Sequence, residues 1–215
     1  KEMIPKIVKN NKKCILLVVS NPLDVLTYLT LKYSKFPKNK VIGTGTVLDT
    51  ARFRYLLGEY FEVNPNSVHA YIMGEHGDSS FPVWSTANIA GVPLRNFKKY
   101  DQKKMDAIYD KTKNAAYEII AKKGATYYAI GMGITRIVNA ILSGHNEVLA
   151  VSSYIENYNG VSDVCLSVPT IISKEGIKEQ IIMPLNDIEL SQLKNSADRI
   201  KESIRSVYIP KKYFF

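Results

Sequence analysis

A continuous apolar run near the start of the chain restricts the fold more than any other feature of the sequence. Residues 14–19, CILLVV, are bounded by polar residues, as expected of a strand covered on both faces in a parallel sheet. The tripeptide Ser-Asn-Pro follows, and residues 23–33 carry the apolar spacing of a helix whose first turn accepts Pro22. Ligands of open α/β sheets bind at the carboxyl ends of strands, so Asn21 is either a ligand contact or a helix cap.

A second strand with glycines, residues 41–45 (VIGTG), leads into a strongly helical segment at residues 46–62. Within this segment Asp49 and Arg52 stand three residues apart, so their side chains face one direction. Such a pair is usually a surface ion pair that contributes little. Because it lies in the first turns after a strand, where a site would form, we consider both residues candidates for function. The helix is expected to bury Val47, Leu48, Ala51, Tyr55 and Leu56.

Candidate chemistry is concentrated in residues 66–84, NSVHAYIMGEHGDSSFPVW. Residues 68–73 predict a short buried strand, and Gly74 and Gly77 supply the flexible backbone that a sharp turn around His76 requires. An imidazole titrates close to neutral pH, so a histidine at a strand end beside two acids is a candidate general acid or base. A purely structural histidine is equally compatible with this stretch alone.

A hydrolase metal site is the rival interpretation of this loop. Its ligands would be Glu75, His76 and Asp78. Adjacent ligands in one short loop, without a further spaced set of His or Cys, make a poor cage. We therefore expect no bound metal.

The second half of the chain alternates predicted strands and helices. They are an edge strand at 87–94, one helix or two abutting helices at 106–143 with a break at 124–126, antiparallel strands at 147–158, 164–173 and 177–183, and a closing helix at 187–208. Gly124 is expected to end the first helical part and Thr126 to cap the second. The predicted fold class is α/β, with the second part of a parallel sheet followed by a mixed α+β domain. The boundary is expected between residues 44 and 62.

Composition excludes several classes of protein. A chain of 215 residues that is 46% hydrophobic and 23% charged can bury a core, so disordered and fibrous classes are excluded. The net charge of +9 comes with lysines scattered in ones and twos, without a long block or a recognition motif. We expect no nucleic-acid partner, although anionic small molecules would be attracted.

Three features predict a cytoplasmic protein without a membrane span. Cys14 and Cys165 lie in apolar runs far apart in sequence, as expected of buried thiols in a reducing compartment. The start of the chain is basic and amphipathic, without the apolar core of a signal peptide. Residues 125–142 are interrupted by Arg136 and Asn139, so they predict a core helix rather than a membrane span.

Four motifs in sequence order carry a resemblance to a known family. They are SNPLDVLTY at 20–28, GTGTVLDTARFRYLLGE at 43–59, GEHGDSSFPVWS at 74–85 and KKGATYYAIG at 122–131. The chain resembles L-lactate dehydrogenases of the bacterial type, in the lactate/malate dehydrogenase family, over essentially its whole length. It corresponds only to the later part of that family, because the first nucleotide-binding half, with its GxGxxG turn, ribose-binding acid and mobile loop, has no counterpart in this sequence.

The resemblance implies two domains. Residues 1–45 correspond to the remaining part of the dinucleotide-binding domain, the second half of a Rossmann-like parallel sheet. Residues 46–215 correspond to the catalytic domain, which binds the substrate. Residues 94–105 are shorter than is usual in the family.

The resemblance also implies roles for individual residues. His76 matches the histidine that gives its proton to the keto oxygen of pyruvate as hydride arrives from NADH. Asp49 matches the carboxylate that hydrogen-bonds the other ring nitrogen and favours the imidazolium. Arg52 matches the guanidinium that grips the substrate carboxylate through two parallel hydrogen bonds.

Further matches surround these three residues. Asn21 matches an amide near the substrate oxygen and the nicotinamide, and Thr126 matches a residue of the substrate pocket. The expected NAD contacts are Val19, Ser20, Asn21, Thr44 and Ile130.

An effector site is implied by two more positions. Arg54 and His69 coincide with the pair that binds fructose 1,6-bisphosphate across a subunit interface in allosteric bacterial lactate dehydrogenases. An arginine and a titratable histidine suit a bisphosphate. The alternative is that Arg54 is a solvated helix residue and His69 a strand-end residue. His145 is expected at the surface.

The sequence therefore predicts an NAD-dependent L-lactate dehydrogenase that reversibly reduces pyruvate to L-lactate. The resemblance implies the final step of fermentative glycolysis and a homotetramer. Trp84 and the KKGATYY form favour lactate over the malate dehydrogenases of the same family. A malate dehydrogenase and an inactive fragment with an intact core remain the alternatives.

Overall fold

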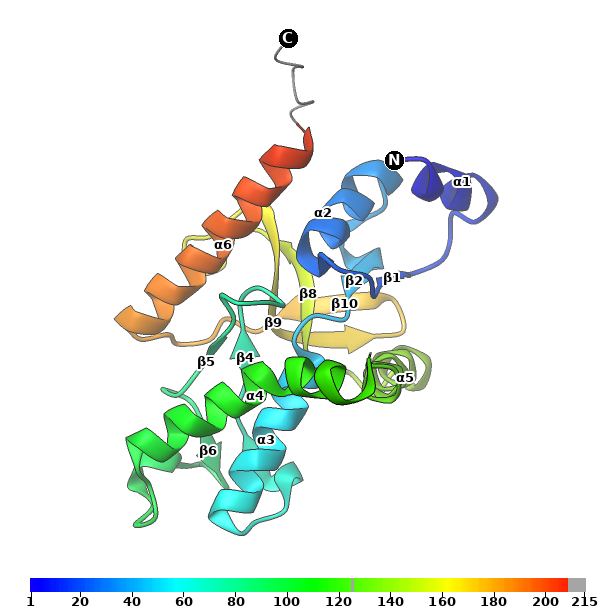
Figure 1. The fold of residues 1–215 in the computed structure, drawn as a ribbon. Coiled ribbons are helices and arrows are strands. Elements are labelled where there is room, and N and C mark those ends of the chain that lie inside the picture. The colour runs from blue at the N-terminus through cyan, green and yellow to red at the C-terminus, as the bar shows by residue number, and fades with distance from the viewer. Residues whose placement is uncertain (125, 209–215) are drawn as a thin grey trace.

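The structure of the protein is a computed structural model that describes residues 1–124 and 126–208. Its centre is a five-stranded sheet in the order β1-β2-β8-β9-β10, with helices on both faces (Figure 1). Within the described residues the helices are α1 (Met3–Asn10), α2 (Leu23–Ser34), α3 (Val47–Phe61), α4 (Gln102–Lys123), α5 (Tyr128–Ser143) and α6 (Asp187–Tyr208), with short 3-10 turns at Lys38–Lys40, Pro65–Ser67 and Leu94–Asn96.

The central sheet joins a parallel part to an antiparallel part. β1 (Leu16–Val18) and β2 (Val41–Gly43) run parallel. β8 (Glu147–Ile155), β9 (Val164–Ser173) and β10 (Gly176–Gln180) continue the sheet as antiparallel pairs. The predicted α/β class is confirmed, and the three antiparallel strands were expected. One detail differs, because β1 is the edge strand and only half-buried, whereas the apolar run predicted cover on both faces.

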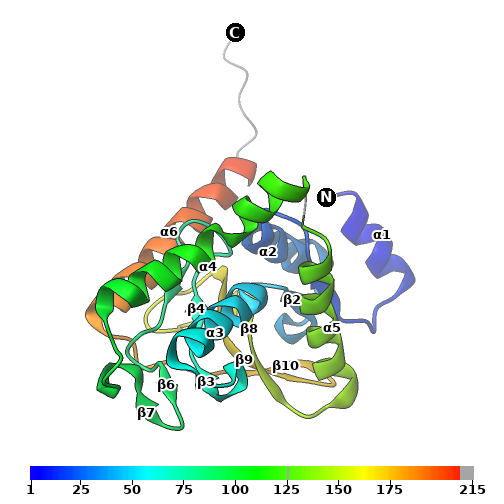
Figure 2. The ribbon, with the colours of Figure 1, turned by 60° about the horizontal axis from the view of Figure 1, so that its bottom comes forward.

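Two apolar clusters hold the helices on the sheet. On one face, Leu29 of α2 and Leu193 of α6 pack with Val168 of β9 in one buried cluster. On the other face, Val47 of α3 and Ile137 of α5 belong to a second cluster with side chains of β2 and β8. Figures 1 and 2 show the sheet between these two layers. The start of α3 is thereby fixed next to the carboxyl end of β2.

Two small sheets lie beside α3 and α4. One contains β3 (Val68–His69), β6 (Asn88–Ile89) and β7 (Val92–Pro93), and the other pairs β4 (Ile72–Met73) with β5 (Phe81–Pro82). A third buried cluster, which includes Phe53, Leu57 and Met105, packs these strands against α3 and α4 (Figure 2). The His76 loop connects β4 to β5 and therefore starts and ends on a rigid support.

Two predicted strands were wrong in extent. The single strand expected at 68–73 is divided between two sheets, because side chains of α3 replace a neighbouring strand: Arg54 Nε donates to the Ala70 carbonyl at 2.8 Å and Thr50 Oγ1 accepts the Ile72 N–H at 3.1 Å. The single edge strand expected at 87–94 is a hairpin of β6 and β7. Its two-residue turn has positive φ at both positions, as hairpin turns of this length require.

Two predictions about helices also need correction. α3 buries Val47, Thr50, Phe53, Leu57 and Gly58, so of the expected set only Val47 is fully buried. Ala51 and Tyr55 are exposed, because the helix presents its inner face to the small sheets and to α4. The break after α4 is confirmed at Gly124, which has φ +76°, but α5 is preceded by Tyr127 without a side-chain cap, so Thr126 does not cap it.

The remaining global expectations concern the membrane and the cysteines. None of the helices in residues 1–124 and 126–208 is both long enough and apolar enough to cross a bilayer. Cys165 is fully buried and Cys14 partly so, and both are free thiols.

Candidate active site

The structure brings together the imidazole of His76, the carboxylate of Asp49 and the guanidinium of Arg52. Asp49 Oδ2 lies 2.9 Å from His76 Nδ1, and Asp49 Oδ1 lies 3.6 Å from an Arg52 terminal nitrogen. The side chains are 27%, 19% and 18% exposed, respectively. The i,i+3 pair that could have been a solvated ion pair is thus largely withdrawn from water and joined to a histidine 27 residues further along the chain.

Glycine and serine residues shape the turn that carries His76. Gly74 has φ +91°, and a Cβ atom there would lie 2.5 Å from the Ser196 hydroxyl oxygen. Its N–H and C=O also pair with Ser167 of β9, at 3.0 and 2.8 Å. The Glu75 carboxylate bonds back to the N–H and hydroxyl of Ser79. Glu75 therefore closes the turn. Among the described residues, no cluster of three or more His, Cys, Asp or Glu side chains is arranged to hold a metal.

The surroundings of His76 favour its protonated form. Burial lowers the pKa of the imidazole, but the hydrogen bond and charge of Asp49, together with the charge of Asp24, outweigh burial and the nearby Arg52, so the pKa is raised above its usual 6.5. Nδ1 is bonded to Asp49, which leaves Nε2 available to a ligand. The arrangement can therefore deliver a proton near neutral pH.

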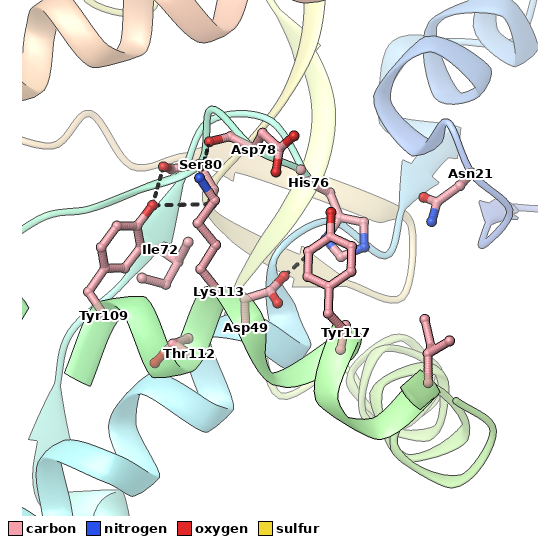
Figure 3. A pocket seen from close by; sticks show the side chains of 13 residues that line it. Asn21, Asp49, Ile72, His76, Asp78, Ser80, Tyr109, Thr112, Lys113 and Tyr117 are labelled. Atoms are coloured by element: carbon pink, nitrogen blue, oxygen red, sulfur yellow. Dashed lines mark hydrogen bonds and ion pairs between the residues drawn. The ribbon is translucent and has the colours of Figure 1, made fainter. Parts of the chain in front are cut away.

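His76 and Asp49 open onto a cavity of about 220 Å³ between the His76 loop, α3 and α4 (Figure 3). Lys113 Nζ donates to the Asp78 carbonyl at 2.7 Å, and the Tyr109 hydroxyl donates to the Ser80 carbonyl, so α4 is bonded directly to the loop. The lining from α4 is Tyr109, Thr112, Lys113, Ala116, Tyr117 and Ile120.

This wall of the cavity was not predicted from the sequence. Its members recur at three- and four-residue intervals, which places them on one face of a helix. That spacing was visible in the sequence, but a stripe mixing tyrosine, lysine and alanine is compatible with any half-exposed helix. Only the fold shows that the stripe faces His76.

Comparison with known proteins places the chain in a family. Residues 46–208 match the alpha/beta C-terminal domain of lactate/malate dehydrogenases, and residues 1–43 match the NAD-binding domain of the same family. The chain belongs to the lactate/malate dehydrogenase family.

Individual members of this family are similar over nearly the whole chain. The L-lactate dehydrogenase of Acetivibrio thermocellus is 54% identical over 97% of this chain and 68% of that protein. L-lactate dehydrogenase 1 of Clostridium acetobutylicum is 51% identical with the same coverage. A crystal structure of the minor L-lactate dehydrogenase of Enterococcus mundtii in a ligands-bound form superposes with a TM-score of 0.91, at 40% identity, over 97% of this chain and 69% of that chain. The resemblance inferred from the motifs is therefore confirmed.

Asn21 and Thr44 follow the carboxyl ends of the two parallel strands, where open α/β sheets bind ligands. Asn21 lines the cavity, and its side chain does not cap α2. Thr44 is buried, and its N–H donates to the Val18 carbonyl at 2.9 Å. Val19 and Ser20 line a different hollow, an apolar one of about 360 Å³ between α1, β1 and α2.

The other two residues that the family resemblance selects lie at the corner between α4 and α5. Thr126 and Ile130 are partly exposed, and neither is among the residues that line the cavity. The structure thus joins Asn21, Asp49 and His76 at one cavity. Arg52 is next to Asp49, and Thr126 and Ile130 are not among the residues that line the cavity.

Arg54 lies outside the cavity as well. Its Nε donates to the Ala70 carbonyl, and its guanidinium lies 4.6 Å from the centre of the Tyr71 ring. His69 is exposed at the end of β3, one residue before Ala70. Neither residue of the expected effector pair lines the His76 cavity, and Arg54 is bonded to the residue that follows His69.

Proposed function

We propose that the protein is an NAD-dependent L-lactate dehydrogenase that reduces pyruvate to L-lactate with NADH and runs the reverse reaction. The observation that carries this proposal is the grouping of His76, Asp49 and Arg52, of which His76 and Asp49 line one cavity, in a chain 54% identical to an L-lactate dehydrogenase. We assign residues 1–45 to the dinucleotide-binding domain and residues 46–215 to the catalytic domain.

His76 supplies the proton in this mechanism. The raised pKa of its imidazole keeps the ring protonated near neutral pH, and Asp49 fixes the ring by accepting the Nδ1–H. Nε2–H then donates to the keto oxygen of pyruvate and, in the reverse direction, the neutral ring takes the proton from the hydroxyl of lactate. The charge of Asp49 stabilises the imidazolium in both directions.

Arg52 orients the substrate. A guanidinium presents two parallel N–H groups to a carboxylate, a geometry that lysine lacks. With Asp49 Oδ1 at 3.6 Å, beyond ordinary hydrogen-bond distance, Arg52 retains donors for the substrate carboxylate. Asn21, which lines the cavity with His76 and Asp49, is suited to donate its amide N–H to the keto oxygen.

The residues present fit a nicotinamide cofactor. The carboxyl ends of β1 and β2 meet next to the His76 cavity, the place where α/β sheets bind nucleotides. Asn21 and Thr44 would contact the cofactor there. Val19 and Ser20, which line the hollow between α1, β1 and α2, and Ile130 of α5 are further contacts that we propose from the family resemblance. When bound, NADH supplies the hydride that completes the reduction.

We further propose a cytoplasmic homotetramer, acting at the last step of fermentative glycolysis, with fructose 1,6-bisphosphate bound between subunits at Arg54 and His69. The support for the effector site is that Arg54 bonds the carbonyl of Ala70, the residue after the exposed His69. The free thiols of Cys14 and Cys165 are consistent with a reducing compartment. In the full-length protein, Arg54→Gln should abolish the activation by fructose 1,6-bisphosphate, while the surface variant His145→Ala should retain it.

The test of the main proposal is steady-state kinetics of the full-length protein with NADH and either pyruvate or oxaloacetate. We expect the larger kcat/KM with pyruvate. A preference for oxaloacetate would make the protein a malate dehydrogenase, and no turnover of either acid by protein that binds NADH would leave it an inactive relative.

A further inference from the structure

A second carboxylate, Asp24, lies beneath the His76 loop and is not used in the mechanism above. Asp24 belongs to the first turn of α2, three residues after Asn21, and is 2% exposed. Its two oxygens have partners from two other parts of the fold. Oδ2 accepts the backbone N–H of His76 at 2.7 Å, and Oδ1 accepts the hydroxyl of Ser152, on β8, at 2.6 Å.

The charge of Asp24 is unfavourable for the fold. Burial raises the pKa of the carboxyl to about 6, although the hydrogen bonds from Ser152 and His76 and the charge of His76 lower it. An asparagine would offer the same kind of oxygen to the His76 N–H without an ion to bury. Accepting these hydrogen bonds therefore does not by itself explain why residue 24 is an acid.

The imidazole of His76 gives such a reason. Asp49 of α3 holds the ring, Asp24 of α2 holds the main chain of the same residue, and both negative charges favour the imidazolium. The other charged groups near Asp24 and His76 are Arg52 of α3, which opposes the imidazolium, and Glu75 of the loop. The neighbours on the sheet, Ser152 and the buried thiol of Cys165, are neutral.

We propose that Asp24 is a positioning residue for proton transfer: it fixes the backbone of His76 and supplies a second negative charge that keeps the imidazole protonated. This inference rests on the proposed role of His76 as the proton donor. It also connects the strand end that carries Asn21 to the catalytic loop, because α2 begins directly after that strand end and Asp24 bonds the loop.

The test is the NMR titration of the three histidine Hε1 signals in the 215-residue chain, which requires neither cofactor nor turnover. Asp24→Asn should lower the pKa of His76 by about half a unit or more, since a charge is removed from its immediate surroundings. The Hε1 signals of His69 and His145 should keep their chemical shifts and so report an intact fold. The matched control is Asp163→Asn, which removes a carboxylate bonded to Tyr28 and Tyr154 and should leave His76 unmoved.

A second measurement covers the case in which Asp24→Asn does not fold. A His76→Gln variant has no imidazole at this position, so the amide of residue 76, which is bonded to Asp24 Oδ2, reports the ionisation of that carboxyl. We expect this amide to shift with a midpoint at or above about pH 6, because the His76 charge that lowers the pKa of Asp24 is removed. An unchanged His76 pKa in folded Asp24→Asn, or an amide signal that stays constant from about pH 4 to 8, would overturn the proposal. Failure of pyruvate turnover would overturn the proposed function without altering either titration.

Discussion

Two regions of the molecule that the proposed reaction requires are built in opposite ways. In the His76 loop polar groups are paired: Ser196 accepts the Glu75 N–H, and Glu75 accepts the N–H and the hydroxyl of Ser79. At the corner between α4 and α5, by contrast, large side chains face solvent. Tyr127 is 67% exposed and Tyr128 86%.

This contrast suggests a division of roles: the paired His76 loop carries proton transfer, and the exposed corner between α4 and α5 contacts the ligands. The loop is held by α2, α3, α6 and β9, so the His76–Asp49 pair is formed before any substrate arrives, which is the condition for efficient general acid catalysis. The corner carries Thr126 and Ile130, the residues assigned to substrate and nicotinamide, beside exposed apolar surface of the kind that marks a binding face. Substitutions in the loop should change the chemical step, and substitutions at the corner should change binding.

The largest effect is expected from His76→Ala. Without the His76 imidazole, the keto oxygen loses its proton donor, so kcat should fall by ~10²–10⁴-fold. Stopped-flow and steady-state oxidation of NADH by pyruvate in the full-length protein would measure it. His145→Ala, on the exposed turn before β8, is the matched control and should leave kcat unchanged. Near-normal pyruvate reduction by His76→Ala would show that the His76 loop does not carry the chemical step.

Asp24→Asn should stabilise the fold near pH 8. Because the folded-state pKa of Asp24 is about 6, above the usual 3.8, the stability that goes with the protonated carboxyl is fully present below about pH 4 and is lost as pH rises toward about 6. The variant should gain on the order of 3 kcal/mol in free energy of unfolding at about pH 8, and nothing below about pH 4. Urea unfolding at both pH values measures this. The exposed Asp198→Asn should show no such dependence, and an equal gain at both pH values would contradict a charge-based cost.

Arg52→Lys should act on binding rather than on proton transfer. Lysine keeps the charge but loses the two-pronged contact with the substrate carboxylate, so the KM for pyruvate should rise about 100-fold, with a smaller fall in kcat. Kinetics with pyruvate, alongside Arg95→Lys on the exposed 3-10 turn, provide the comparison. A fall in kcat with unchanged KM would show that Arg52 acts on the proton-transfer step and not on substrate binding.

The smallest effects distinguish the two regions by stability alone. Gly74→Ala combines a positive φ with a contact to Ser196 and Phe81, and should lower the free energy of unfolding by about 2 kcal/mol or more. Gly124→Ala, at the corner, has a positive φ but no atom within 4 Å, and should lower it by about 1 kcal/mol. Denaturant unfolding of both variants tests the contrast, and equal losses would show that the loop is no tighter than the corner.

Local patterns predicted the elements that stabilise themselves through one long apolar face. The closing helix was expected at the residues that form α6, and the break at Gly124 followed from the glycine alone. The strand predicted at 68–73 was wrong because its middle residues take their hydrogen-bond partners from Arg54 and Thr50 of α3, which no local pattern defines. The strand predicted at 87–94 was wrong because Ala90 and Gly91 form the turn of a hairpin.

The site could be predicted only in part, because some of its contacts join residues that are far apart in the sequence. His76 and the Asp49–Arg52 pair stand out because a histidine between glycines and an i,i+3 ion pair are local features. Asp24 does not stand out, since an acid in the first turn of a helix is the ordinary complement of the helix dipole. Its contact with His76 joins residues 52 positions apart.

The pH dependence of pyruvate reduction by the full-length protein tests the His76–Asp49 pair most directly. Only the imidazolium donates, so kcat/KM should be constant at low pH and fall as pH rises through the His76 pKa, which lies above 6.5. In Asp49→Asn the midpoint should move to lower pH and the plateau should drop. A midpoint that stays where it is in the wild type would show that Asp49 does not hold the proton on His76.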